Sequence, residues 1–157
     1  MLMPPRVRLR RVEEHDLPVF FEHQRDPDAN RMANFDARDL DAFMAHWRKI
    51  LGDETVVVRT VELDGLVTGN VVSWDHDGER DVGYWIGRQF WGKGIATAAL
   101  AAFLEELDTR PLHAHVATHN VASIRVLEKC GFERTGDGST PSVEDGGVEE
   151  LVLKLAR

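Results

Sequence analysis

The sequence has only one cysteine in 157 residues, Cys130, and this scarcity excludes several classes of protein. A single thiol forms neither an internal disulfide framework nor a cysteine-based metal cluster. No stretch approaches the ~18 apolar residues that a membrane span needs, and no long apolar segment follows residues 1–5 as in a signal peptide. We therefore expect a cytoplasmic location, no membrane partner and a buried Cys130 thiol rather than a nucleophile.

Basic residues are also scarce relative to acidic ones. The chain has 19 lysines and arginines against 27 aspartates and glutamates, a net charge of −8. Nucleic-acid binding needs a basic surface, so we expect no nucleic-acid partner. Repeats and low-complexity segments are absent, and 43% apolar content over this length suits one hydrophobic core. We expect a single domain over residues 1–157.

Acidic residues are missing from residues 82–104, where even spacing would place about four of the 27. This segment ends a predicted strand, passes through Gly92 and Gly94, and opens an alanine-rich helix. Glycine allows main-chain N–H groups to turn inward, and a helix N-terminus adds unpaired donors and a positive dipole end. The pattern predicts a cradle for a diphosphate; the alternative is a buried turn that tolerates no carboxylate.

Two common phosphate-binding motifs do not match this segment. The phosphate-binding loop of nucleoside triphosphatases has Lys and then Ser or Thr directly after its last glycine, whereas Gly94 is followed by Ile95 and Ala96. A dinucleotide fold needs an acidic residue after the next strand, but the predicted strand 112–118 leads into His119 and Asn120.

Two motifs instead resemble those of the GCN5-related N-acetyltransferase (GNAT) superfamily. The first is Gln89, Gly92 and Gly94 in the pattern Gln-x-x-Gly-x-Gly, preceded by Gly-Tyr-Trp-Ile-Gly at 83–87. The second, residues 120–132, is similar to the ribosomal-protein alanine acetyltransferase branch. The resemblance covers nearly the whole chain. It implies an α/β (α+β) fold with a single mixed, mostly antiparallel sheet of about seven strands, about four helices, and splayed fourth and fifth strands.

Hydrophobic periodicity predicts the elements of such a fold. A hairpin signal at Asp64-Gly65 joins two of the strands, a break is expected at 26–28, and residues 136–147 form a polar loop. The helix at 39–51 has an apolar stripe that we assign to the core. The predicted strands are 7–12, 55–63, 66–74, 81–86, 112–118, 132–135 and 148–155, and the predicted helices are 16–24, 39–51, one from the glycine turn to about 108, and 121–130.

The resemblance implies acetyl-CoA as cosubstrate, held between the splayed strands with its pantetheine arm along residues 84–87. Asn120 is also a good helix N-cap, and Lys129 is also explained as a solvated helix residue. Carried over by this resemblance, the cofactor-binding residues are Trp85, Ile86, Gly87, Arg88, Gln89, Phe90, Trp91, Gly92, Lys93, Gly94, Ile95, Ala96, Thr97, Asn120, Ser123 and Lys129.

The implied reaction is direct attack of an amine on the thioester, which needs a base for the amine and an acid for the thiolate. Asp81 matches the base position of the family; the alternative is a surface residue at the start of a strand. In the family, a tyrosine that acts as the general acid often occupies the position that is Leu127 in this chain. Tyr84, the only tyrosine, and Ser123 are then the catalytic hydroxyls, unless Ser123 is only a first-turn helix residue.

Histidines offer further proton carriers, although packed or surface roles are more common for them. Their spacing matches no metal motif, so we expect no metal. The histidines concerned are His76, His113, His115 and His119.

Residues 13–41 contain nine acidic and three basic residues, a charge of −6. By the resemblance this region covers the acceptor site, so a cationic primary amine is favoured, either a protein N-terminus or a small molecule; the alternative is a solvated acidic surface. The predicted function is an acetyl-CoA-dependent N-acetyltransferase. A catalytically idle acyl-CoA-binding module and a small dinucleotide- or phosphate-binding domain are the alternatives, and the oligomeric state, monomer or homodimer, stays open.

Overall fold

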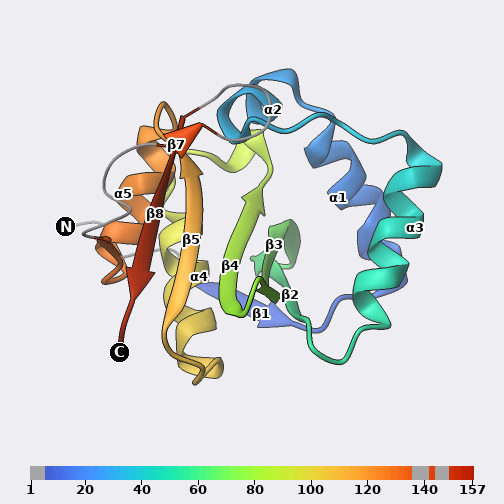
Figure 1. The fold of residues 1–157 in the computed structure, drawn as a ribbon. Helices are drawn as coiled ribbons and strands as arrows, with labels where there is room; N and C mark the ends of the chain where they lie inside the picture. The colour runs from blue at the N-terminus through green and yellow to red at the C-terminus, as the bar shows by residue number, and fades with distance from the viewer. Residues whose placement is uncertain (1–5, 136–141, 144–148) are drawn as a thin grey trace.

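The computed structural model describes residues 6–135, 142–143 and 149–157. Its strands form one mixed sheet in the order β1-β2-β3-β4-β5-β8-β6, with β7 paired to β8 (Figure 1). Neighbouring strands are antiparallel except β4 and β5, so the predicted fold class is confirmed. The strands are β1 (Val7–Arg10), β2 (Val57–Leu63), β3 (Leu66–His76), β4 (Glu79–Ile86), β5 (Leu112–Ala117), β6 (Glu133–Arg134), β7 (Ser142–Val143) and β8 (Glu149–Leu155).

Five α-helices and two 3-10 turns accompany the sheet in the described part of the chain. None of these helices is long and apolar enough to cross a membrane. The helical elements are η1 (Glu14–Asp16), α1 (Leu17–Gln24), α2 (Pro27–Ala33), α3 (Leu40–Leu51), η2 (Arg88–Phe90), α4 (Ile95–Glu106) and α5 (Val121–Lys129).

Helix α2 corrects the predicted break at 26–28. The Asp26 carboxylate accepts hydrogen bonds from the N–H groups of Asp28 and Ala29, so it caps a helix whose first residue is Pro27. Proline suits that first position because its nitrogen has no hydrogen to leave unpaired. Strand β7 is a second correction, because it lies within the segment that was predicted to be a polar loop.

Tight turns join the antiparallel strands. Asp64 and Gly65 both have positive φ, 53° and 80°, which confirms the predicted hairpin. Asp77 and Gly78 repeat this geometry, with φ of 51° and 81°, between β3 and β4. The Asp-Gly pair favours such turns because aspartate and glycine tolerate left-handed backbone angles. The second turn extends β3 beyond its predicted end at residue 74.

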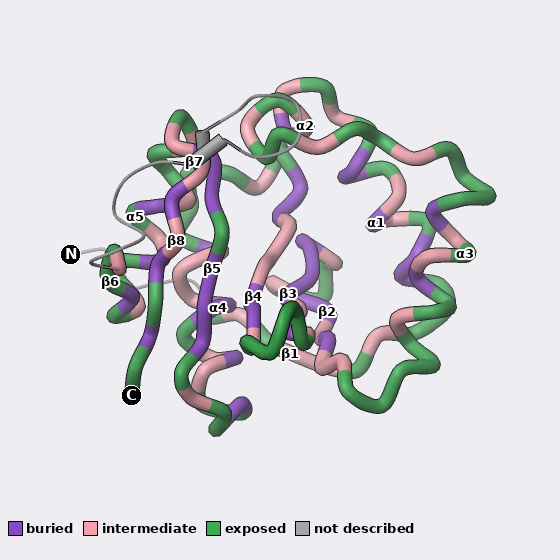
Figure 2. Tube along the Cα trace, in the orientation of Figure 1, coloured by how far each residue is buried: buried purple, intermediate pink, exposed green. Residues whose placement is uncertain are grey.

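The sheet carries hydrophobic clusters on both faces, and Figure 2 shows where buried residues lie along the strands and helices. Along β3, Val71 packs in the cluster of α4 and α5, whereas its neighbour Val72 packs against the cluster of α1 and α3. Successive side chains of a strand point to opposite faces, so these helix pairs cover opposite sides. Phe43 and Trp47 of α3 are buried, which confirms the core assignment of that helix stripe.

Strands β4 and β5 are paired at one position only. Their single paired position is Asp81 with His113, near the start of both strands. Strand β4 is held by β3 along its whole length, and β5 is held by β8 from Leu112 to Ala117. Beyond the shared position the two parallel strands form no ladder, which confirms the predicted splay.

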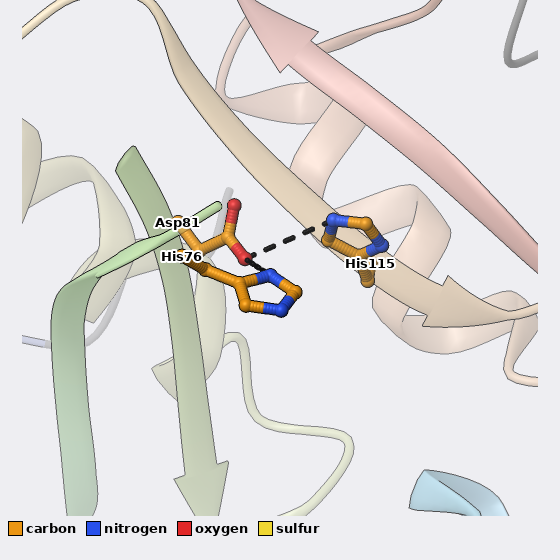
Figure 3. A group of neighbouring side chains, drawn as sticks. All are labelled: His76, Asp81 and His115. Carbon is orange, nitrogen blue, oxygen red and sulfur yellow. Dashed lines mark hydrogen bonds and ion pairs between the residues drawn. The ribbon is translucent and has the colours of Figure 1, made fainter. Parts of the chain in front are cut away.

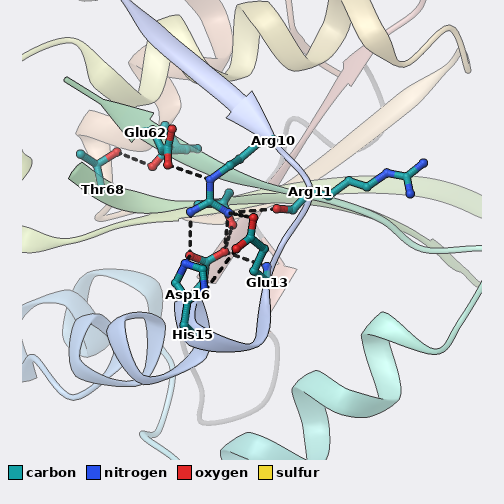
Figure 4. A network of polar contacts seen from close by, with 9 residues as sticks. Arg10, Arg11, Glu13, His15, Asp16, Glu62 and Thr68 are labelled. Atoms are coloured by element: carbon teal, nitrogen blue, oxygen red, sulfur yellow. Dashed lines mark hydrogen bonds and ion pairs between the residues drawn. The ribbon is translucent and has the colours of Figure 1, made fainter. Parts of the chain in front are cut away.

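A buried ion pair anchors the start of α1 to the sheet (Figure 4). Arg10 donates hydrogen bonds to both carboxylate oxygens of Asp16, at 2.7 and 2.8 Å, and to Glu62 on β2 at 2.7 Å. Asp16 is fully buried and also accepts hydrogen bonds from Thr60 and from the Glu13 N–H. Burial raises the pKa of Asp16, but the hydrogen bonds from Arg10, Glu13 and Thr60 outweigh it, so this pKa lies below its ordinary value.

Replacing Asp16 with Asn should lower the free energy of unfolding near pH 7 by about 3 kcal/mol, because Arg10 then keeps a buried charge without its main partner. The native carboxylate has the lower pKa, so its contribution is present above the unfolded value of about 3.9 and is lost as the pH falls through the folded value. Urea unfolding at several pH values should therefore show the difference between the two proteins shrinking in acid.

The matched control is Glu22→Gln, which removes an exposed ion pair with Arg25 (N···O 3.1 Å). Exposed pairs contribute little, so we expect a change below ~1 kcal/mol. If the free energy of unfolding of Asp16→Asn stays below the native value by the same amount from neutral to acidic pH, the assigned role of the carboxylate is contradicted.

Candidate active site

A cavity of about 520 Å³ lies where β4 and β5 diverge. Its wall is formed by the end of β4, the loop to α4, the first turn of α4, and one side each of α2 and α5. The lining residues are Ala29, Met32, Ala33, Tyr84, Trp85, Ile86, Phe90, Trp91, Gly92, Gly94, Ile95, Ala96, Thr97, Asn120, Ala122, Ser123, Arg125, Val126 and Lys129.

The glycine loop at one end of this cavity has the geometry of an anion site. Gly92 and Gly94 have φ of 77° and 78°, and a side chain on Gly92 would enter open space. The first hydrogen bond of α4 runs from the Ala98 N–H to the Gly94 carbonyl, so the N–H groups of residues 95–97 precede it. No acidic side chain lies in this first turn. The loop therefore presents main-chain donors and the positive end of a helix dipole.

Most of the predicted cofactor residues line the cavity, but Gly87, Arg88, Gln89 and Lys93 are not among its lining residues. Arg88 turns toward α2, where its guanidinium lies 2.6 Å from the Asp28 carboxylate. The Gly87 N–H donates to the Thr68 carbonyl. The His23 ring packs so closely on Gly87 that an added Cβ would come within 2.6 Å of it.

Six lining residues were not predicted, and they come from α2 and α5. Those of α2 were missed because its first residues were interpreted as a break, although an aspartate followed by proline is a usual helix start. Those of α5 follow from helical spacing around the predicted Ser123. The six are Ala29, Met32, Ala33, Ala122, Arg125 and Val126.

Two predicted catalytic hydroxyls meet inside the cavity. The Tyr84 hydroxyl on β4 lies 2.7 Å from the Ser123 Oγ on α5. Burial raises the pKa of Tyr84 to about 12, so its hydroxyl keeps its proton at neutral pH. The Asn120 side chain accepts a hydrogen bond from the Ser123 N–H, which confirms its N-cap role, and it also lines the cavity.

The third predicted catalytic residue, Asp81, lies apart from this pair. Alternation along β4 places Tyr84 on the face of α4 and α5 and Asp81 on the opposite face. Asp81 is only 2% exposed, so the alternative of a surface residue at a strand start is wrong. Its carboxylate oxygen lies 3.1 Å from His76 Nδ1 and 3.7 Å from His115 Nε2 (Figure 3).

Burial is the main influence on this carboxylate and raises the pKa of Asp81, while the nearby histidines oppose the rise. One oxygen, Oδ1, is buried without a hydrogen-bond partner among the described residues. A carboxylate in this state accepts a proton more readily than an exposed one. His119, another predicted proton carrier, instead contacts the Arg31 carbonyl at 2.8 Å.

Comparison with known proteins places this geometry in a family. The family model for the GNAT acetyltransferase domain matches residues 6–133. An uncharacterized N-acetyltransferase, p20, of Bacillus licheniformis is 27% identical over 86% of this chain and 83% of its own. A putative ribosomal N-acetyltransferase, YdaF, of Bacillus subtilis is 28% identical over 71% of this chain and 65% of its own.

Solved structures agree at the level of the fold. A spermidine N-acetyltransferase from Vibrio cholerae, in complex with CoA and spermine, is 18% identical with a TM-score of 0.82 over 96% of this chain and 95% of that one. An aminoglycoside acetyltransferase in complex with coenzyme A is 22% identical with a TM-score of 0.79, covering 97% and 95%. The wedge-shaped gap between β4 and β5, the glycine loop and the family match lead to one conclusion: the chain belongs to the GNAT family of acetyltransferases.

Proposed function

We propose that this protein transfers the acetyl group of acetyl-CoA to a primary amine by direct attack. The observation that carries the proposal is the cavity between β4 and β5, which joins an anion-binding loop to a pair of hydroxyl groups. The proposal treats residues 1–157 as one domain and keeps a cytoplasmic location.

The cofactor fits the cavity by its chemistry. The diphosphate would accept hydrogen bonds from the main-chain N–H groups at the start of α4. Arg125 and Lys129 lie one turn apart on α5 and line the same cavity, so they add positive charge for phosphate groups. The pantetheine arm would lie along the unpaired edge of β4, where residues 84–86 form no ladder with β5.

The chemistry follows from bringing the two substrates together. The amine nitrogen attacks the thioester carbonyl carbon, the C–S bond breaks, and the sulfur leaves as a thiolate that needs a proton. Tyr84 and Ser123 share a short hydrogen bond, and either hydroxyl can be the donor. The raised pKa of Tyr84 keeps its hydroxyl protonated at neutral pH, so the pair has a proton to give to the thiolate.

Asp81 is the proposed base. It lies on the sheet face that carries α1 and α3, so the amine would approach from the side opposite the hydroxyl pair. Its buried carboxylate would take the proton that the amine loses when the new C–N bond forms. The exposed ring of His76 beside it connects this position with solvent.

The acceptor class is proposed as a primary amine, either a protein N-terminus or a cationic small molecule. Related folds were solved with spermine and with kanamycin. The structure reduces the charge argument from residues 13–41, however. Glu14, Asp16 and Asp28 pair with Arg48, Arg10 and Arg88, which lie outside this segment, so three of its six excess negative charges are neutralised. Charge therefore favours a cationic acceptor only weakly.

The test is a panel of amines with detection of released CoA thiol. The panel should include spermidine, kanamycin and peptides with different N-terminal residues, each with acetyl-CoA and the full chain. We expect thiol release that requires both substrates. If acetyl-CoA raises the melting temperature but no amine releases thiol, the idle acyl-CoA-binding module is supported instead, and if only NAD or ATP raises it, the nucleotide-binding domain is.

Gly92→Val should weaken CoA binding by at least about tenfold, or ~1.4 kcal/mol, because the new side chain enters the open space above the loop. Isothermal titration calorimetry with CoA measures the change in affinity. Gly65→Val is the matched control, since Gly65 has nearly the same φ of 80° and open surroundings in a hairpin turn. It should lose similar stability through backbone strain yet bind CoA normally. Equal affinity in both variants would remove the loop from the site.

Asp81→Asn should lower kcat by about a hundredfold or more, the usual contribution of a general base, and change CoA affinity little. The comparison variant is Asp75→Asn, which alters an exposed carboxylate on the same hairpin that pairs with Arg80 at 3.1 Å. Its kcat should match the native value. If Asp81→Asn keeps native turnover with the best amine of the panel, Asp81 is not the base.

A further inference from the structure

Three side chains from different strands converge on one point beside the wedge (Figure 3). His76 ends β3, Asp81 lies near the start of β4, and His115 lies in β5. One ligand atom from each residue lies within 4.8 Å of both others, and Asp81 Oδ2 faces His76 Nδ1 and His115 Nε2. We propose that these three residues bind a divalent transition-metal ion of the zinc type.

The spacing of the three atoms suits such an ion. Zinc binds imidazole nitrogen and carboxylate oxygen at about 2.0–2.2 Å, which separates tetrahedral ligands by about 3.4 Å. The distances from Asp81 Oδ2 to His76 Nδ1 and to His115 Nε2 are 3.1 and 3.7 Å, on either side of that value. Small side-chain rotations would therefore complete the site. Two imidazoles and one carboxylate favour zinc or a similar ion over magnesium or calcium, which prefer oxygen ligands.

The outer nitrogens of both histidines also face carboxylates. His76 Nε2 lies 3.4 Å from an Asp77 oxygen, and His115 Nδ1 lies 4.0 Å from a Glu150 oxygen. Histidines that bind metal usually present the other ring nitrogen to a carboxylate, which fixes the ring and strengthens it as a ligand. Both carboxylates lie within ion-pair distance of these nitrogens, and a small shift would bring each to hydrogen-bond distance. The carboxylates also make the surroundings negative, which attracts a cation.

The buried carboxylate supplies a further, independent reason. Asp81 is almost fully buried, and its Oδ1 lacks a hydrogen-bond partner among the described residues. Buried carboxylate oxygens normally have a partner, so this one needs an explanation. A cation held by both carboxylate oxygens would balance the charge of Asp81 and give Oδ1 its partner. The two histidines are partly exposed, with side-chain exposures of 55% for His76 and 31% for His115, so an ion has a route to the site.

Histidine spacing in the sequence predicts no metal, but the pairing of β3, β4 and β5 brings His76, Asp81 and His115 together. The proposed ion would also affect catalysis, a consequence that rests on the proposed function. If Asp81 is the base of acetyl transfer, an ion on its carboxylate would compete with the amine proton. Zinc would then inhibit the transferase, and a chelator would restore its activity.

The test is isothermal titration of the full chain, purified without a histidine tag, with Zn²⁺ after chelator treatment. We expect one ion per chain. His76→Gln and His115→Gln should each weaken binding at least ~100-fold, since loss of even an outer partner of a metal-binding histidine costs 10–100-fold. Absorption of the Co²⁺-loaded protein in the visible range should show the strong bands of a four-coordinate site, and both variants should lose them.

The control is His15→Gln, because the His15 ring also lies near two carboxylates, those of Glu13 and Asp16, but belongs to neither group of potential metal ligands in the described part of the chain. This variant should bind zinc as the native protein does. Absence of a one-to-one site in the native protein, or native affinity in both ligand variants, would overturn the proposal. His113→Gln tests the neighbouring group of Glu79, Asp81 and His113; loss of binding in that variant alone would overturn the assigned ligands. These titrations need no turnover, so they succeed or fail independently of the transferase assay.

Discussion

The single paired position between β4 and β5 is the constraint on which the rest of the structure depends. Strand β4 pairs with β3 along its whole length and β5 pairs with β8, whereas β4 and β5 share only the pair Asp81 and His113. Main-chain groups of β4 beyond that pair therefore have no ladder partner on this side. An unpaired strand edge beside a cavity is a natural place for an extended ligand to add its own hydrogen bonds.

The side chains proposed for proton transfer also lie on opposite faces of the sheet. Alternation along β4 sends Tyr84 toward α5, where it meets Ser123, and sends Asp81 to the opposite face, where it meets His76 and His115. The hydroxyl pair lines the cavity, whereas Asp81 is not among the lining residues. In the proposed reaction the acid and the base therefore act from opposite faces of β4.

Buried polar groups hold this arrangement in place. Asp16 ties the start of α1 to Arg10 on β1 and Thr60 on β2. Helix α1 in turn packs His23 against Gly87 at the end of β4, and the His23 carbonyl accepts a hydrogen bond from the Trp85 ring. Helix α2 is joined to the neighbouring residue through the ion pair of Asp28 with Arg88. Both N-terminal helices therefore hold the segment that leads from β4 into the glycine loop.

Local patterns in the sequence were sufficient for the glycine loop, the capped helix α5 and the Asp64-Gly65 hairpin, because backbone preferences and N-caps act over a few residues. The resemblance supplied the mixed sheet and the splay of its fourth and fifth strands. The sequence did not show that Arg88 turns away from the cavity, that α2 begins at Pro27, or that Asp81 is buried between two histidines. Those features depend on residues far apart in the chain, such as His76 and His115, and only the pairing of β3, β4 and β5 brings them together.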